Sequence, residues 1–551
     1  MRFILSILCV SLCLIFAGTP STPALAAVDF RYGTEIESFK ARTGGAFLWH
    51  SRRGKLTRDG YALVRTLEDS WQHGLNPSEY HIQAIRRYMA DGDNTAPGYF
   101  DQLLSEAYLR YARDLGGMRI SPRDIGQRRN YWQRPPETDT LLEQVASGRD
   151  LRRIFSELQP QGPLYEALKK ELINLYQNYD KLEHSFERIR LDSGRALKPG
   201  ERANAVPLLR ERLDVRQDTP DAYFYDQRLT DAVVKFQKTN SLQTDGIIGP
   251  QTLAALNKTP RQQLEQVIVN MERLRWLDRV KPQRYVLVNI PSATMWAVDN
   301  EIVMLESRVV VGREKRPTHS FVTEITGVRF NPKWTVPPTI KREDYLPMLR
   351  EDPLALSRKG IELMSRNEEG VMQTLDPTAI DWHEVGAGEL HDIRMVQGAG
   401  PTNPLGSIRV LMPNRYNIYL HDTTSPQYFQ AGERAFSSGC VRVAEPERLA
   451  DFILQGRGDW NDDYVQRQLA SGKTRDISIS NPIPVYLIYL TIWAGDDGRL
   501  VYGNDIYDQD QVLLAALRGR DGFLDVAEFQ HMGGPRRNME RADLALHDQN
   551  R

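Results

Sequence analysis

The sequence predicts a multidomain α+β protein, with helices in its first half and mostly β-strands in its second half. The chain has 551 residues, and at roughly 150 residues per domain this length suggests three or four domains. Apolar residues recur at helical spacing before about residue 275, and runs rich in β-branched and aromatic residues begin at Arg284. The Gly, Pro and apolar contents are ordinary for a globular protein, so most of the chain can bury hydrophobic cores.

The first residues have the pattern of a secretion signal. Arg2 precedes an apolar run from Phe3 to Ala17, which has the length of a signal-peptide core and is short for a membrane span. Ala24-Leu25-Ala26 is a candidate cleavage motif. We therefore expect residues 1–26 to be a signal peptide and the protein to be exported, with an uncleaved membrane anchor as the alternative.

The balance of charge argues against a nucleic-acid partner. The formal net charge is −1, and basic and acidic residues are mixed along the chain. Such a chain has no long-range positive field for nucleic acid and no polybasic patch for a membrane surface.

Cysteine usage singles out one residue. The three cysteines are Cys9, Cys13 and Cys440, and the first two lie inside the predicted signal. The mature protein would then carry a lone thiol in an oxidising compartment, where the thiol has no disulfide partner in the chain and is open to oxidation. Position alone leaves two interpretations open: a functional thiol, or a buried, inert cysteine that acts as a small hydrophobe.

Residues 30–197 are predicted to form a helical scaffold domain. Helix-period apolar positions occur in residues 61–67, 103–109 and 164–176, and Pro-containing segments separate these helices. Because no chemically active side chains converge in this region, we expect a packing role.

Residues 198–260 are predicted to form a compact three-helix unit. Apolar positions fit three helix faces near Val206, near Val233 and near Leu253. Between the second and third helices, Gly246 and Gly249 suit a turn, and Pro250 suits the first position of a helix. The Phe236-Gln237 pair, the Asp245-Gly246 turn and the run Gly249-Pro250-Gln251-Thr252-Leu253 resemble the peptidoglycan-binding domain found in many cell-wall enzymes.

Residues 261–517 are predicted to form a mostly β domain after one linking helix. Strand patterns occur at the segments 284–290, 293–298, 302–311, 408–412, 416–420 and 485–493. Residues 339–400 interrupt this pattern with a helix-like segment and a polar stretch, so we expect an insertion that caps one end of the sheet. The charged, Gly-containing segment 518–551 is predicted to be a flexible tail.

The stretch that carries chemistry contains His421 and Cys440. His421 closes the predicted strand 416–420, and Ser437-Ser438-Gly439 forms a tight turn immediately before Cys440. A thiol at its ordinary pKa of about 8.5 is mostly protonated near neutral pH, so a neighbouring imidazole is needed to accept its proton. The thiolate can then attack an amide carbonyl, and amides near the turn can hold the oxyanion. A third group must orient the imidazole, and the Asp422 side chain and a nearby backbone carbonyl are equally open choices.

These residues resemble the L,D-transpeptidase family. Ser437-Ser438-Gly439-Cys440-Val441-Arg442 matches the family's Ser-(His/Ser)-Gly-Cys-Val/Ile-Arg signature, and His421 precedes it at the family's spacing. Further upstream, Asn331-Pro332-Lys333-Trp334 and Asn403-Pro404-Leu405-Gly406 are similar to other family segments, whereas His319 stands where proline is common. The serine variant of the signature is similar to the large periplasmic members, which have a scaffold, a peptidoglycan-binding domain and a capped catalytic domain.

The resemblance implies a cysteine acyltransferase that forms 3→3 cross-links in peptidoglycan without a cofactor. Cys440 would be the nucleophile and His421 the general base, with release of D-alanine from a tetrapeptide stem and a thioester intermediate. The supporting residues would be Tyr419, Gly439, Asp422, Ser438 and Arg442, with Tyr419 and the Gly439 and Cys440 amides around the oxyanion. It also implies a periplasmic location, covalent inhibition by carbapenems, and contact with peptide stems, glycan strands and other cell-wall synthases.

Several alternatives remain open from sequence. The same site could serve an L,D-carboxypeptidase, a cross-link hydrolase or an exchange of D-amino acids, because these differ only in the acceptor. A non-catalytic wall-binding scaffold is an alternative of another class. A zinc enzyme is disfavoured, because no other histidine of the mature chain lies in a paired ligand motif.

Overall fold

The computed structural model describes residues 28–51, 55–91, 97–126, 133–191, 194–217, 219–279, 281–455, 461–495, 497–520, 524–526 and 529. The predicted signal peptide over 1–26 and most of the predicted tail over 518–551 lie outside these residues. No helix in the described ranges is both long and apolar enough to cross a membrane.

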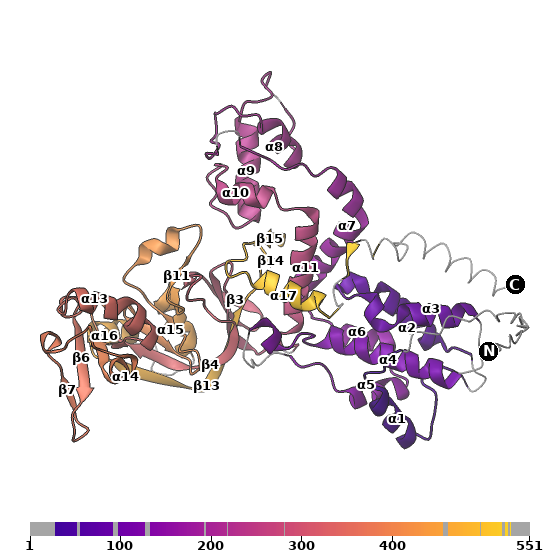
Figure 1. The fold of residues 1–551 in the computed structure, drawn as a ribbon, viewed down its shortest axis with the longest axis horizontal. Coiled ribbons are helices and arrows are strands. Elements are labelled where there is room, and N and C mark those ends of the chain that lie inside the picture. Colours follow the sequence, from indigo (N-terminus) through magenta and orange to yellow (C-terminus); the bar gives the residue numbers. More distant parts are fainter. Residues whose placement is uncertain are drawn as a thin grey trace, which may run out of the picture.

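The N-terminal region is helical, as predicted. Its helices are α1 (Gly33–Arg42), α2 (Arg58–Glu68), α3 (Ile82–Asp91), α4 (Pro97–Gly116), α5 (Thr138–Ala146), α6 (Leu151–Leu158) and α7 (Pro163–His184). α4 is the central element, because Leu104, Tyr108 and Leu115 on it are fully buried against the surrounding helices. Figure 1 shows this group at one end of the elongated molecule.

A small helical unit stands apart from the long axis of the molecule (Figure 1). It consists of α8 (Val206–Arg212), α9 (Gln227–Thr239) and α10 (Pro250–Leu256), which confirms the three predicted helices. Pro250 is the first residue of α10, and Gly246 has a φ of +70°, which suits glycine. Buried Gln237 holds the turn between α9 and α10, because its amide donates to Asp245 Oδ1 at 3.0 Å and accepts from Gly246 N at 2.9 Å.

The linking helix α11 (Pro260–Arg275) returns the chain to the centre of the molecule. Its first turn has a capping box between Thr259 and Gln262. It packs against α7, and the cluster that they share also includes residues of α17 (Gln509–Arg518). α17, which follows the last β-strand, therefore joins the C-terminal half of the chain to the helical region.

The second half of the chain forms a mostly β domain, as predicted. In the described residues one sheet of nine strands has the order β11-β3-β12-β10-β9-β4-β13-β1-β2, and β2 also pairs with β3, so the sheet closes on itself. The strands are β1 (Arg284–Asn289), β2 (Thr294–Asp299), β3 (Ile302–Gly312), β4 (Phe321–Phe330), β9 (Ile408–Leu411), β10 (Leu420–His421), β11 (Ala435–Ser437), β12 (Val441–Val443) and β13 (Arg475–Ile488). Helices α15 (Pro446–Leu454) and α16 (Asp462–Ala470) contribute to its core, and β14 (Ile492–Ala494) pairs with β15 (Leu500–Tyr502).

Two of the expected strands differ in extent. The predicted strand 416–420 is wrong over most of its length, because only Leu420 and His421 form a strand. Asn417 has a φ of +53°, and the Asn414 side chain accepts from the amides of Tyr416 and Ile418, so the backbone turns there. The strand expected to run from 485 to 493 starts earlier, at Arg475, and breaks after Ile488 before β14 begins.

The segment expected to be an insertion forms a second small sheet with its own core, which we call the cap. Its sheet has the order β5-β8-β6-β7, and Trp334, Leu349 and Trp382 are among its buried residues. The elements are β5 (Trp334–Thr335), α12 (Pro338–Ile340), a π-helical turn (Lys341–Tyr345), α13 (Leu346–Glu351), β6 (Ile361–Arg366), β7 (Met372–Thr374), α14 (Ala387–Asp392) and β8 (Arg394–Gln397). The cap lies at the end of the molecule opposite the N-terminal helices (Figure 1).

Candidate active site

Two adjacent strands bring the predicted site residues together. β10 and β12 pair in parallel, with Leu420 opposite Val441 and His421 opposite Arg442. Leu420 and Val441 are fully buried in the core of the β domain. Because successive side chains of a strand point to opposite faces, His421 and Arg442 share the other face, and Cys440, two residues before Arg442, lies on that face as well.

The turn before Cys440 is held from both sides. Gly439 has a φ of +111°, a conformation that residues with a side chain rarely adopt. On one side, Ser437 Oγ accepts from the Gly439 amide at 3.1 Å and donates to the Cys440 carbonyl at 2.5 Å. On the other side, Thr318 Oγ1 donates to the Gly439 carbonyl at 2.8 Å. The Gly439 amide, predicted as an oxyanion donor, is thus occupied within the turn in this state.

The thiol of Cys440 is half-buried and carries its proton. Its Sγ donates to the Asn417 carbonyl at 3.6 Å, and the Tyr419 hydroxyl bonds to the sulfur. Burial raises the pKa of the Cys440 thiol, while Tyr419 and the nearby cations of Arg409 and Arg442 act in the opposite direction. The thiol is therefore uncharged at rest.

The imidazole of His421 is buried, with 5% of its surface exposed, and is held by the backbone. Its Nδ1 donates to the carbonyl of Asp422. Burial lowers the pKa of His421 to about 3, with Arg442 and Arg409 adding to the shift and the Asp422 and Leu405 carbonyls opposing it. No hydrogen bond joins this imidazole to Cys440 Sγ among the described contacts, so the resting pair consists of two neutral groups.

The side chain of Asp422 does not orient His421. Its carboxylate accepts from the amide and hydroxyl of Ser407 at 2.7 and 2.8 Å, and from the Thr423 amide at 2.6 Å. The sequence left open whether the Asp422 side chain or a backbone carbonyl orients His421. In the structure, the backbone carbonyl of Asp422 has this role. The Asp422 carboxylate instead fixes the loop between Ser407 and Thr423, and thereby the position of the carbonyl.

A second arginine, which the sequence analysis did not identify, lies beside His421. Arg409 of β9 is the strand partner of His421, and its guanidinium carbon lies 4.0 Å from the centre of the Tyr419 ring. Arg442 lies on the other side of His421, 5.7 Å from the Tyr428 ring. Within the described part of the chain, neither arginine has a carboxylate at ion-pair distance. In the sequence, the alternation Ile408-Arg409-Val410 places Arg409 on the strand face opposite its two apolar neighbours. Both neighbours are buried in the structure, so Arg409 faces the site.

Ser438 connects the nucleophile turn to the cap. The exposed Ser438 accepts from Arg316 Nη1 at 3.2 Å. Arg316 in turn pairs with Glu343 at 2.8 Å and Asp344 at 2.6 Å, both in the π-helical turn of the cap. Tyr419 packs against both the core of the β domain and the core of the cap. The cap and the site are thus in direct contact.

Metal ligation has no support at this site. Across the described residues, no group of three or more His, Cys, Asp or Glu side chains is arranged to hold a metal ion. The polar groups that surround Cys440 are instead cations, a phenol and backbone carbonyls.

Comparison with known proteins finds matches to three regions of the chain. Residues 283–465 match the family model of the YkuD L,D-transpeptidase catalytic domain, residues 203–256 match a "Putative peptidoglycan binding domain", and residues 34–172 match a "Scaffold domain". A "Putative L,D-transpeptidase" of Haemophilus influenzae is 34% identical over 254 residues, which is 46% of this chain and 50% of that protein. The chain thus spans about half the length of this curated relative.

Solved structures give only distant similarity. An L,D-transpeptidase fragment from Xylanimonas cellulosilytica is 15% identical with a TM-score of 0.16, covering 53% of this chain and 98% of that one. An L,D-transpeptidase from Stackebrandtia nassauensis is 12% identical with a TM-score of 0.21, covering 53% of this chain and 94% of that one.

The matched catalytic model contains His421, Cys440 and the strands that carry them, and it follows a matched scaffold and peptidoglycan-binding region. The chain therefore contains a YkuD L,D-transpeptidase catalytic domain, preceded by a scaffold domain and a putative peptidoglycan-binding domain.

Proposed function

We propose that the protein is an exported, periplasmic L,D-transpeptidase that forms 3→3 cross-links between peptide stems of peptidoglycan. The observation that carries the proposal is the placement of Cys440. The thiol lies on a turn held by Ser437 and Thr318, one strand away from an imidazole whose Nδ1 is bound to the Asp422 carbonyl.

The first half-reaction is acyl transfer to sulfur. With Nδ1 donating to Asp422, the proton-free Nε2 of His421 is the base. Rotation about the Cα–Cβ bond of Cys440 releases Sγ from the Asn417 carbonyl and turns it toward His421. As Sγ attacks the carbonyl of the third stem residue, its proton passes to Nε2. The C–N bond to D-alanine then breaks, the leaving amine takes that proton, and a thioester forms.

The second half-reaction transfers the acyl group to an amine. The side-chain amine of a second stem attacks the thioester carbonyl and gives its proton to His421. The C–S bond breaks, and the thiolate of Cys440 regains the proton. The Tyr419 hydroxyl, which bonds to the sulfur, lies where charge develops on the thiolate.

The cations of the site suit the charge of the substrate. A tetrapeptide stem ends in a carboxylate close to the bond that breaks. Arg409 and Arg442 flank His421 without a carboxylate partner among the described residues, so either can bind the terminal carboxylate of the stem. The cap, which reaches Ser438 through Arg316, would control access of this stem.

Mass spectrometry of the mature protein tests the proposal. After mixing with tetrapeptide-stem muropeptides, we expect a dimer that lacks one D-alanine, and after mixing with a carbapenem we expect an adduct on Cys440. A Cys440→Ala variant should give neither product. D-Alanine and tripeptide monomers without a dimer would indicate a hydrolase, and full cellular function of the Cys440→Ala variant would indicate a non-catalytic scaffold.

A further inference from the structure

The turn that carries Cys440 is fastened to the end of β3 by one buried hydroxyl. Thr318, with none of its surface exposed, donates to the Gly439 carbonyl at 2.8 Å and accepts from the Gly312 amide at 2.9 Å. Gly312 is the last residue of β3. The Thr318 hydroxyl therefore fixes the carbonyl of Gly439 relative to the sheet.

The Gly439 carbonyl and the Cys440 amide belong to the same peptide group. Because a trans peptide group is planar, its C=O and N–H point in opposite directions, and a bond that holds the carbonyl also sets the direction of the N–H. The Gly439 amide is occupied within the turn, whereas no acceptor for the Cys440 amide occurs among the described contacts. Of the two amides expected around the oxyanion, that of Cys440 is thus the one left available.

Tyr507, which lies outside the matched catalytic region 283–465, clamps the support of this peptide group. Its hydroxyl donates to the Gly312 carbonyl and accepts from the Thr318 amide at 3.3 Å. With the bond from the Gly312 amide to the Thr318 hydroxyl, these contacts form a closed ring of three hydrogen bonds. Tyr507 therefore acts on the Gly439 carbonyl through Thr318.

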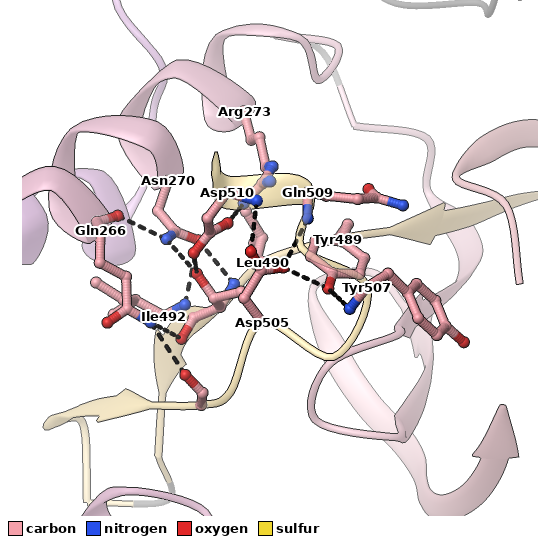
Figure 2. A network of polar contacts seen from close by, with 12 residues as sticks. Gln266, Asn270, Arg273, Tyr489, Leu490, Ile492, Asp505, Tyr507, Gln509 and Asp510 are labelled. Atoms are coloured by element: carbon pink, nitrogen blue, oxygen red, sulfur yellow. Dashed lines mark hydrogen bonds and ion pairs between the residues drawn. The ribbon is translucent and has the colours of Figure 1, made fainter. Parts of the chain in front are cut away.

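Tyr507 is itself held by a buried polar network, which Figure 2 shows. Its amide donates to the Tyr489 hydroxyl at 2.9 Å, and that hydroxyl donates to Asp505 at 2.7 Å. In Figure 2 the ring of Tyr507 extends away from the network. The backbone of Tyr507 is thus anchored in the network, while its hydroxyl reaches the segment beneath the nucleophile turn.

The network is fastened to the linking helix α11. Asp505 accepts from the Asp510 amide at 2.7 Å, and the Asp510 carboxylate pairs with Arg273 of α11. Thr491 donates through its hydroxyl to Asp510 at 2.7 Å and through its amide to Asn270 of α11 at 2.8 Å. The position of Tyr507 is therefore set by a helix that precedes the matched catalytic region.

We propose that Tyr507 is a positioning residue for the acylation of Cys440. Through Thr318, it keeps the Cys440 amide directed at the oxyanion that forms when the thiol attacks a carbonyl; this role rests on the proposed transpeptidase function. A donor that is fixed in advance needs no reorganisation as charge develops on the oxygen. The segment 489–510 and α11 thus belong to the catalytic unit, although both lie outside the matched catalytic region.

Selective labelling observes this peptide group directly. The sequence contains the pair Gly-Cys once, at 439–440. Labelling with [¹³C′]glycine and [¹⁵N]cysteine therefore gives a single carbonyl–amide cross-peak in a TROSY-HNCO spectrum. Tyr507→Phe removes the hydroxyl and keeps the ring, and Thr318→Val removes the next hydroxyl of the path. Tyr502→Phe is the matched control, because Tyr502 is also half-buried and its hydroxyl bonds to Glu171 at 3.1 Å.

Two reactions of Cys440 separate positioning from a general structural effect. Acylation by a carbapenem passes through an oxyanion, whereas alkylation by iodoacetamide needs only the thiol. We expect Tyr507→Phe and Thr318→Val each to lower the maximal rate of acylation about tenfold, and Tyr502→Phe to change it less than twofold. Alkylation should change less than twofold in all three variants, and thermal unfolding checks that each variant folds.

In the spectrum, Tyr507→Phe and Thr318→Val should move the cross-peak by more than its linewidth, and Tyr502→Phe by less. An unmoved cross-peak or an unchanged acylation rate in folded Tyr507→Phe protein overturns the proposal, as does an equal loss of acylation and alkylation. If Tyr507→Phe does not fold, the same results with Thr318→Val decide. A wild-type protein that no carbapenem acylates refutes the proposed function, whereas the cross-peak still decides whether Tyr507 holds the Gly439–Cys440 peptide group.

Discussion

The imidazole of His421 is predicted to stay uncharged in the resting protein from pH 8 down to about pH 4. Its pKa is lowered from 6.5 to about 3 by burial and by the cations of Arg442 and Arg409. This lowering of the pKa corresponds to about 5 kcal/mol in favour of the neutral form of the imidazole. At pH 6, roughly one folded molecule in a thousand would carry the proton, compared with about three in four for a free imidazole.

The sign of the effect on stability follows from this shift. The unfolded chain binds a proton at His421 below about pH 6.5, whereas the folded chain binds it only near pH 3. Acidification through this window therefore favours unfolding. Above pH 6.5 neither state binds the proton, and His421 makes no pH-dependent contribution.

Ring-labelled [¹³C]histidine provides the measurement, because the imidazole carbon shifts on protonation. The chain has 10 histidines, and a His421→Gln variant identifies the resonance by its loss. We expect no titration of this resonance between pH 8 and 4, and a higher pKa in an Arg409→Gln variant, because one of the cations that lower it is removed. The rate of Cys440 acylation by a carbapenem should be flat between pH 5 and 8.

Two results would refute this reasoning. A resonance that titrates near pH 6 to 7 would show that the imidazole is accessible to solvent. A resonance that is already protonated at pH 7 would show a thiolate–imidazolium pair at rest, in place of two neutral groups.

Three further predictions concern packing and the cap. Leu420→Ala removes a fully buried side chain beside His421 and should destabilise the catalytic domain by about 2–5 kcal/mol, as measured by urea unfolding. Ile302→Ala, at a 64% exposed position, is the control and should change the free energy of unfolding by less than about 0.5 kcal/mol. Gln237→Ala leaves the Gly246 amide and Asp245 without their buried partner and should cost about 1–3 kcal/mol, seen as faster hydrogen exchange in α9 and α10 but not in α4. Arg316→Ala removes the contacts to Glu343, Asp344 and Ser438 and should speed hydrogen exchange in residues 341–351; unchanged exchange there would show that the cap is held by its apolar contacts alone.

The elements that could be predicted from sequence are those with strong local patterns. α9 and α10 carry apolar faces, and Pro250 and Gly246 mark the turn between them, so both helices were located closely. Strands β1, β2 and β3, of which β2 pairs with the other two, could be predicted because their β-rich runs are long. The turn before Cys440 could be predicted because the run Ser437-Ser438-Gly439 is typical of a tight turn. Gly439 indeed has a φ of +111°, which favours glycine.

The remaining features depend on contacts between distant segments. The segment 416–420 has the composition of a strand, but the side chain of Asn414 bonds to its backbone and turns it, which a strand pattern does not reveal. Arg409 and Arg316 lie 12 or more residues from His421 and Ser438 and meet them only through strand pairing and cap packing. The orienting group of His421 is a backbone carbonyl, and every residue has one, so residue types could not identify it.

The resting state of the site also accounts for a lone thiol in the oxidising compartment proposed for this protein. Oxidation proceeds through the thiolate, and its rate follows thiolate content and exposure. Burial raises the pKa of Cys440, and the neutral His421 does not stabilise a thiolate. The thiol therefore stays protonated on the Asn417 carbonyl until the substrate, which we propose is a stem peptide, enters. If this reasoning holds, Arg409→Gln, which raises the basicity of His421 but removes a cation near the sulfur, should change carbapenem acylation and peroxide sensitivity by different factors. Equal factors for both reactions would mean that the cation and the imidazole do not act separately on the sulfur.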